Sequence, residues 1–148
     1  MAIMPVALKR RFKLKPMLAG TVSDLKALNY PLYGSPKLDG IRVLLHPELG
    51  PVTRNFKPVA NRHAREQLLK YCPFSFDGEI IVGDPTNAKC FNETSSAIMS
   101  HGGSPKFSFY VFDTFHCEND GFQKRLQRYK DTVNNIECNS PILSLFIV

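Results

Sequence analysis

A lysine, an aspartate, a glycine and an arginine occur close together in the segment Lys37-Leu38-Asp39-Gly40-Ile41-Arg42. Lysine is a nucleophile only as the free amine, and a nearby cation such as Arg42, with a partly desolvated pocket, would lower its pKa. Such an amine could attack the α-phosphate of a nucleoside triphosphate, forming a phosphoramidate and expelling pyrophosphate. The same residues also fit a charged hairpin turn, in which Asp39-Gly40 supplies only the turn geometry.

Three later segments add charged and aromatic side chains beside apolar stretches. They are Thr53-Arg54-Asn55, Phe76-Asp77-Gly78-Glu79-Ile80-Ile81 and Phe109-Tyr110-Val111-Phe112-Asp113. Taken singly, Glu79 could equally be an exposed acid on a strand or a functional residue. Phe112 could equally be an ordinary core residue or a functional one. The information therefore lies in the order of the segments along the chain.

Hydrophobic periodicity predicts the strands and helices that must hold these residues. Short apolar or alternating runs predict strands at residues 32–35, 41–46, 52–56, 76–82, 107–115 and 143–148. Helical spacing of apolar residues predicts helices at residues 21–29, 61–70, 94–99 and 122–133. The mixture predicts an α+β fold in which antiparallel sheets pack together, with short helices outside. The strongly apolar last strand is expected to be buried inside a sheet, with more chain to follow, although a terminal core strand is the alternative.

Charge and length limit the class of protein. The 148 residues suffice for one domain with a core, and the net charge is +6. A basic N-terminal arm, residues 1–15, holds candidate contacts for nucleic-acid phosphates, namely Lys9, Arg10, Arg11, Lys13 and Lys15. A solvated arm, or one that meets anionic lipid, is the alternative. No apolar run is long enough to span a bilayer, and the arm is not followed by the apolar segment of a signal peptide, so a cytoplasmic protein without a membrane partner is expected.

In their order along the chain, the four segments resemble the covalent nucleotidyltransferase superfamily. The closest resemblance is to the adenylation domain of ATP-dependent DNA ligases of the small phage and bacterial type. It covers residues 16–128, and Pro16-Met17-Leu18-Ala19 is similar to the segment that opens this domain in many ligases. The resemblance implies an incomplete ATP-grasp-like nucleotidyltransferase domain at residues 16–148.

The resemblance also implies roles for residues around the lysine. Lys37 would be the residue that becomes adenylylated, with Ser35 and Pro36 beside it at the nucleotide. Arg42 and Arg54 match family arginines that contact the ribose and the phosphates. Many DNA ligases carry an acid two positions before the nucleophile, where this sequence has Ser35, so adenine recognition by a side chain at that position is not implied.

Two further matches concern the nucleoside. Glu79 matches the acid that binds the ribose hydroxyls, and Phe112 matches an aromatic ring that stacks on adenine. The implied cofactors are ATP and a divalent metal, expected to be Mg²⁺, whose ligands the sequence does not identify. The implied reaction is lysine adenylylation by ATP, AMP transfer to a DNA 5′-phosphate and sealing of nicked double-stranded DNA, as in DNA replication, repair and recombination.

The later family motifs have no match in these residues. No E-G-x-x-x-K-like segment follows Phe112, and neither a final K-x-K/R pair nor an OB-fold domain is present. We therefore expect a ligase domain truncated at its C-terminus, which is inactive by itself or depends on a second polypeptide. An RNA ligase or a capping guanylyltransferase shares K-x-D-G and is an alternative. A non-catalytic DNA-binding remnant, holding phosphates through its arm and a basic face at residues 124–130, is another.

Overall fold

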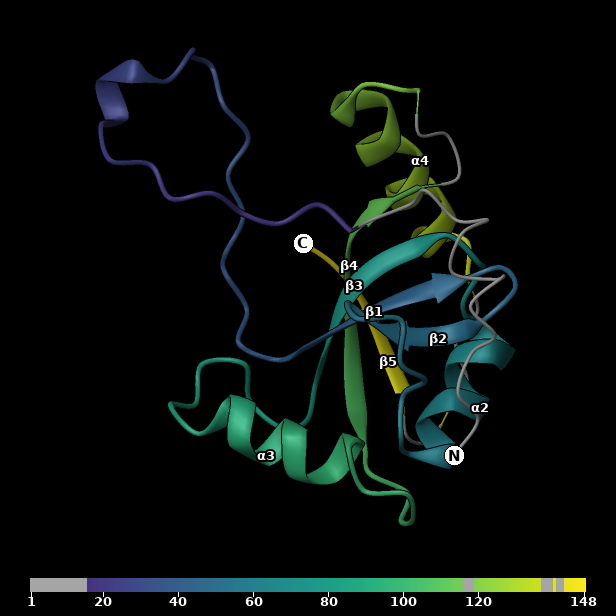
Figure 1. Ribbon diagram of the computed structural model, residues 1–148. Coiled ribbons are helices and arrows are strands. Elements are labelled where there is room, and N and C mark those ends of the chain that lie inside the picture. The colour runs from purple at the N-terminus through teal and green to yellow at the C-terminus, as the bar shows by residue number, and fades with distance from the viewer. Residues whose placement is uncertain (1–15, 116–118, 137–139, 141–142) are drawn as a thin grey trace. The chain divides into compact units, whose positions relative to one another are not determined.

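The computed structural model describes residues 16–115, 119–136, 140 and 143–148, and it divides the chain into two units between Gly34 and Ser35 (Figure 1). The basic residues proposed as phosphate contacts lie outside the described residues; these are Lys9, Arg10, Arg11, Lys13 and Lys15. Their role and the boundary of the arm at residue 15 remain predictions.

The described part of the first unit contains one short element, the 3-10 helix η1 (Leu25–Ala27). Asp24 caps it, because its side chain accepts a hydrogen bond from the Lys26 N–H at 2.9 Å. The longer helix predicted at residues 21–29 is wrong, since helices this short are marginal without a packing surface. The strand predicted at residues 32–35 is wrong too, because this segment is not paired with a neighbouring strand.

The second unit is built on one five-stranded sheet in the order β2-β1-β3-β4-β5 (Figure 1). Its strands are β1 (Ile41–His46), β2 (Gly50–Thr53), β3 (Phe76–Ile81), β4 (Phe107–Thr114) and β5 (Leu143–Ile147). The first four strands pair antiparallel, whereas β5 pairs parallel to β4. The α+β class is confirmed, and the described residues form one mixed sheet rather than the several antiparallel sheets that we predicted. The intervening helix carries the chain back so that β5 can run parallel.

The position of β5 differs from its prediction. It lies at an edge of the sheet in the described residues, where Leu143 is buried, Leu145 and Ile147 are half-buried and Phe146 is 44% exposed. The strand is therefore confirmed, but its predicted burial inside the sheet is wrong for these residues. A run of apolar residues has no period to distinguish a central strand from an edge strand, because that difference depends on the neighbours.

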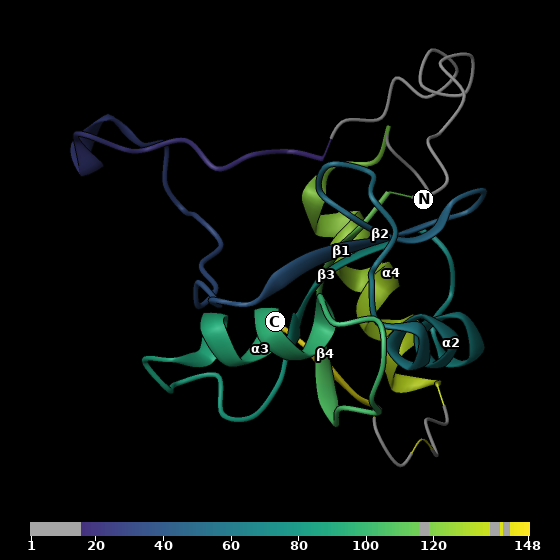
Figure 2. The same cartoon turned by 60° about the horizontal axis from the view of Figure 1, so that its bottom comes forward.

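Three helices complete the unit: α2 (Arg62–Tyr71), α3 (Cys90–Ile98) and α4 (Phe122–Asn134). Asn61 caps α2 by accepting from the Ala64 N–H at 2.8 Å, so the helix predicted at residues 61–70 is confirmed within one residue. The helix predicted at 94–99 begins earlier, at Cys90. Helix α4 packs on β4 and β5, and α2 on β2 and β5 (Figure 2). Of the helices in the described residues, none is both long and apolar enough to cross a membrane.

The main apolar cluster leaves one face of the sheet for polar side chains. Val43 of β1, Ile80 of β3 and Phe109 of β4 are fully buried in the cluster together with Leu68 of α2 and Tyr129 of α4. Successive side chains on a strand point to opposite faces. Residues that alternate with this core, among them the candidates on β1, β3 and β4, consequently share the other face.

A β-bulge lies between β3 and β4, at Asp77 and Gly78 of β3. Asp77 pairs with Asp113, but Gly78 pairs with Val111, so Phe112 is the extra residue on β4. Gly78 allows this close packing, because a Cβ there would lie 2.5 Å from the Tyr110 carbonyl oxygen. The bulge turns Phe112 and Asp113 toward the same polar region.

Candidate functional site

The strand directions bring the separated segments to one end of the sheet. Lys37 precedes β1, and Arg54 follows β2, which runs antiparallel to β1 with Thr53 opposite Val43. Glu79 lies near the end of β3, directly opposite Arg42. Segments that are dozens of residues apart therefore meet around the start of β1.

Gly40 makes the closest approach between the lysine segment and β3. Its N–H donates to Glu79 Oε1 at 3.2 Å. A Cβ at this position would lie 2.2 Å from the Ile80 carbonyl oxygen and 2.8 Å from Ile81 Cγ1. Only glycine fits at this position without moving the backbone.

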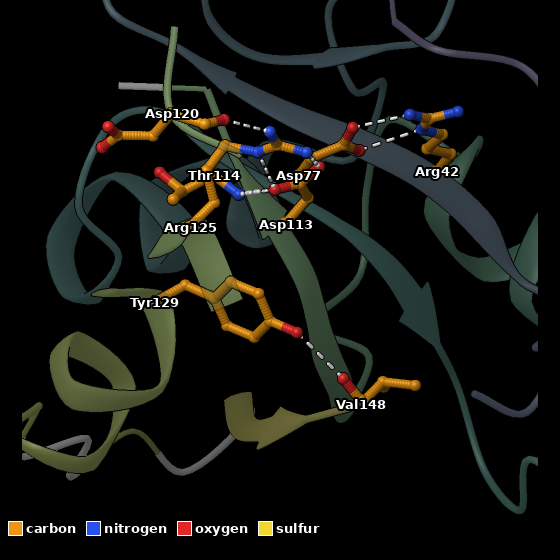
Figure 3. A network of polar contacts seen from close by, with 8 residues as sticks. All are labelled: Arg42, Asp77, Asp113, Thr114, Asp120, Arg125, Tyr129 and Val148. Atoms are coloured by element: carbon orange, nitrogen blue, oxygen red, sulfur yellow. Dashed lines mark hydrogen bonds and ion pairs between the residues drawn. The ribbon is translucent and has the colours of Figure 1, made fainter. Parts of the chain in front are cut away.

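Arg42 is held by a carboxylate to which the sequence analysis gave no role. Its Nε lies 2.9 Å from Asp77 Oδ1 and its Nη2 lies 2.6 Å from Asp77 Oδ2 (Figure 3). The two side chains are only 20% and 10% exposed. The guanidinium carbon also lies 5.5 Å from the centroid of the Phe112 ring. The sequence contained a signal for Asp77, because an acid two positions before Glu79 on the same strand must lie on the same face of the sheet.

Glu79 is a partly buried acid with a strongly shifted pKa. Burial raises its pKa to about 7, against the lowering effects of the Gly40 N–H, Arg42 and Lys37. The nearby Asp77 charge raises it further. Half of the Glu79 side chains are therefore protonated near neutral pH, and the acceptor form predominates above it.

The shift gives stability a defined dependence on pH. Between the unfolded value of 4.5 and the folded value of about 7, the folded chain binds more protons at Glu79 than the unfolded chain. The stabilisation that comes from proton binding at Glu79 is thus present below pH 4.5 and is lost as pH rises through about 7. We expect Glu79→Gln, which keeps an acceptor for Gly40, to stabilise the protein more at pH ~8 than at pH ~5. Urea unfolding of both proteins at the two pH values measures this, and an equal effect at both would contradict it.

Lys37 is placed differently from the expectation. Its side chain is 86% exposed, and its Nζ donates to Asp39 Oδ1. This hydrogen bond and the Asp39 charge raise the pKa of Lys37, and Glu79 raises it slightly as well. The predicted lowering by Arg42 and a desolvated pocket is therefore wrong for this structure. The cause is local, because Asp39, two positions later in the chain, accepts a hydrogen bond from the amine.

The remaining candidates lie on the surface. Ser35 and Pro36 are exposed in the irregular segment before β1. Arg54 is exposed in the turn that follows β2, which is closed by a hydrogen bond of 2.8 Å from the Phe56 N–H to the Thr53 carbonyl. The structure thus joins Arg42, Glu79 and Phe112 in one cluster and leaves the other candidates around its edge.

The described side chains do not form a metal site. They contain no group of three or more His, Cys, Asp or Glu side chains arranged to hold a metal ion. Asp77 and Asp113 come close to each other, but each is engaged by an arginine. The predicted divalent metal is consequently assigned no ligands here.

Solved structures of one enzyme match this fold. The Chlorella virus DNA ligase-adenylate has a TM-score of 0.77 and 27% sequence identity with this chain, over 91% of this chain and 49% of that one. The fold is that of a DNA ligase nucleotidyltransferase domain. A second structure of the Chlorella virus ligase-adenylate gives a TM-score of 0.75 and 26% identity over 90% and 48% of the two chains. No family model and no curated protein matches the sequence.

The comparison confirms the resemblance that the four segments predicted. This nucleotidyltransferase domain is similar to the adenylation domain of small ATP-dependent DNA ligases. It spans about half the length of the viral ligase.

Proposed function

We propose that this nucleotidyltransferase domain is the nucleotide-binding part of an ATP-dependent DNA ligase, with Lys37 as the residue that takes AMP. The observation that supports this most is the cluster beside the lysine segment. It joins a carboxylate, Glu79, a guanidinium, Arg42, and an aromatic ring, Phe112, in the fold of a ligase-adenylate.

In the proposed first step, Lys37 Nζ attacks the α-phosphorus of ATP. The nitrogen–phosphorus bond forms, the bond from phosphorus to pyrophosphate breaks, and the amine gives up a proton. Because Asp39 holds the charged amine and raises its pKa, Lys37 must leave Asp39 and be deprotonated before it attacks. In the second step an oxygen of a DNA 5′-phosphate displaces the lysine, which regains its proton, and nick sealing then releases AMP.

The neighbouring residues are proposed to bind and orient the nucleotide. Phe112 stacks on adenine, an interaction worth roughly 1–3 kcal/mol per base. Glu79 accepts hydrogen bonds from the ribose hydroxyls in its ionised form. Arg42 contacts the ribose and the phosphates, and Arg54 reaches them from its turn, with Ser35 and Pro36 lining the approach.

Other components of the proposed reaction lie outside the described residues. A divalent metal, expected to be Mg²⁺, would neutralise charge on the triphosphate when bound. The nicked DNA substrate, a role for the basic arm and a cytoplasmic location remain predictions. We also propose that further phosphate-binding groups come from outside these 148 residues, for example from a second polypeptide.

The test is covalent labelling with ATP that carries a label on its α-phosphate. We expect the chain to bind ATP in preference to GTP and to form an acid-labile, base-stable adduct that requires divalent metal. The absence of each phosphate-binding group should slow labelling about 10²–10³-fold. We therefore expect labelling to become faster when the second half of the Chlorella virus ligase is added. Preference for GTP would favour a capping enzyme, and sealing of nicked RNA over nicked DNA an RNA ligase. Salt-sensitive DNA binding without ATP binding would contradict the proposal.

A further inference from the structure

Four charged side chains form a row that leads from the candidate site to helix α4 (Figure 3). Arg42 and Asp77 make the first pair. Asp113 and Arg125 make the second, with Arg125 Nε 2.8 Å from Asp113 Oδ1 and Nη2 3.1 Å from Oδ2. The order along the row is positive, negative, negative, positive.

The two carboxylates in the middle of the row face each other. Asp77 on β3 is paired with Asp113 on β4 at the bulge. Like charges directly opposite each other on neighbouring strands are destabilising. Burial and then the Asp113 charge raise the pKa of Asp77, while Arg42 lowers it. The Asp113 charge therefore opposes ionisation of Asp77, in addition to the larger effect of burial, and a group that neutralises Asp113 favours ionisation.

Arg125 is fixed well enough to neutralise Asp113. It lies in the first turn of α4 and is only 16% exposed. Its Nη1 donates to the Asp120 carbonyl at 2.6 Å, and its guanidinium carbon lies 5.7 Å from the Phe122 ring centroid. A planar guanidinium that makes two parallel hydrogen bonds holds a carboxylate in one orientation.

We propose that Arg125 positions Arg42 through the two carboxylates between them. The functional part of this inference rests on the proposed nucleotide site. Without Arg125, the Asp113 charge would push Asp77 to take up a proton or turn away. The Arg42 guanidinium would then lose the two hydrogen bonds to Asp77 that orient it. Arg125 would act through the two carboxylates and not by direct contact with the nucleotide.

The test compares Arg125→Met with Arg125→Met/Asp113→Asn. The single substitution should weaken ATP binding about tenfold, the scale for losing a partner that orients a ligating residue. Asparagine at position 113 removes the opposing charge and can still accept from the Thr114 N–H, which lies 2.8 Å from Asp113 Oδ1. The double variant should therefore recover most of the affinity. Lys124→Met, an exposed neighbour on the same helix, serves as the matched control and should bind ATP as the unchanged protein does.

A second readout does not require ATP. The urea midpoint of Arg125→Met should fall further below the unchanged protein at pH ~8 than at pH ~5, and Asp113→Asn should remove this difference. The charges of this row also affect Glu79 and Tyr129, since Asp77 raises the pKa of Glu79 and Asp113 raises that of Tyr129. Both residues are present in every variant, so the differences between variants start from the substitutions at positions 125 and 113.

The outcomes separate this inference from the proposed function. Loss of affinity in Arg125→Met that Asp113→Asn restores supports it. Unchanged affinity, or a loss that the second substitution does not restore, overturns it. If the unchanged protein binds no ATP, the proposed function fails, and the pH-dependent midpoints alone then decide whether the charged row couples α4 to Arg42.

Discussion

Replacing Lys37 with methionine should abolish covalent attachment of AMP, by about 10⁴-fold or more, the scale seen when a covalent nucleophile is removed. Methionine keeps an unbranched side chain but has no amine to bond with phosphorus. The Lys37 side chain is 86% exposed, and its ion-pair partner Asp39 is 66% exposed. The free energy of unfolding should therefore change by less than about 0.5 kcal/mol, as at other surface positions.

Labelling with α-phosphate-labelled ATP, followed by mass spectrometry of the adduct, measures this effect. Lys26→Met is a suitable control, because Lys26 is an exposed lysine whose ordered hydrogen bond comes from its backbone N–H. ATP binding without transfer should persist in Lys37→Met. A label that survives at normal yield would show that another residue is the nucleophile, and the proposed function would fail.

Alanine at Gly40 should be among the most damaging small substitutions in the chain. Its Cβ would lie 2.2 Å from the Ile80 carbonyl oxygen and 2.9 Å from Glu79 Cγ. A backbone carbonyl within a sheet cannot move aside as a flexible side chain can. We expect a loss of about 3 kcal/mol in the free energy of unfolding, at the upper end for overpacking. Separation of β1 from β3 should also weaken the Gly40 hydrogen bond to Glu79 and thus ATP binding.

Gly102→Ala is the matched control, because a Cβ at Gly102 meets nothing within 4 Å and this glycine is not in the left-handed region. Urea unfolding of the two variants and the unchanged protein gives the comparison. Equal midpoints for Gly40→Ala and Gly102→Ala would mean that the segment before β1 is not held against β3 as the structure has it.

The position of Lys37 in this structure bears on how the site would work. The amine is paired with Asp39 and its pKa is raised, so the structure holds the lysine in its unreactive, charged form. In the proposed reaction, nucleotide binding would have to separate this pair. The motif therefore carries both the proposed nucleophile and the acid that holds it in its charged form, two positions apart.

Much of the fold could be predicted from local patterns. Strand β1 was predicted residue for residue from a short apolar run. Helices α2 and α4 were predicted nearly so, because each has a clear apolar period and α2 has Asn61 as its cap. The four segments also sufficed to identify the ligase type of domain. Prediction failed at residues 21–35, where apolar residues have helical or strand-like spacing but the described structure forms only the short helix Leu25–Ala27 and no strand.

The chemistry of the candidate site followed from residue types, but its electrostatics did not. Position along the chain identified Lys37, Arg42 and Glu79 as candidates for a nucleotide site. The pairing of Arg42 with Asp77 and the opposition of Asp77 to Asp113 arise from strand register and a bulge. Such pairings join residues that are far apart in sequence, so no local pattern records them. Charge interactions depend on separation and burial, which the chain acquires only when its strands are side by side.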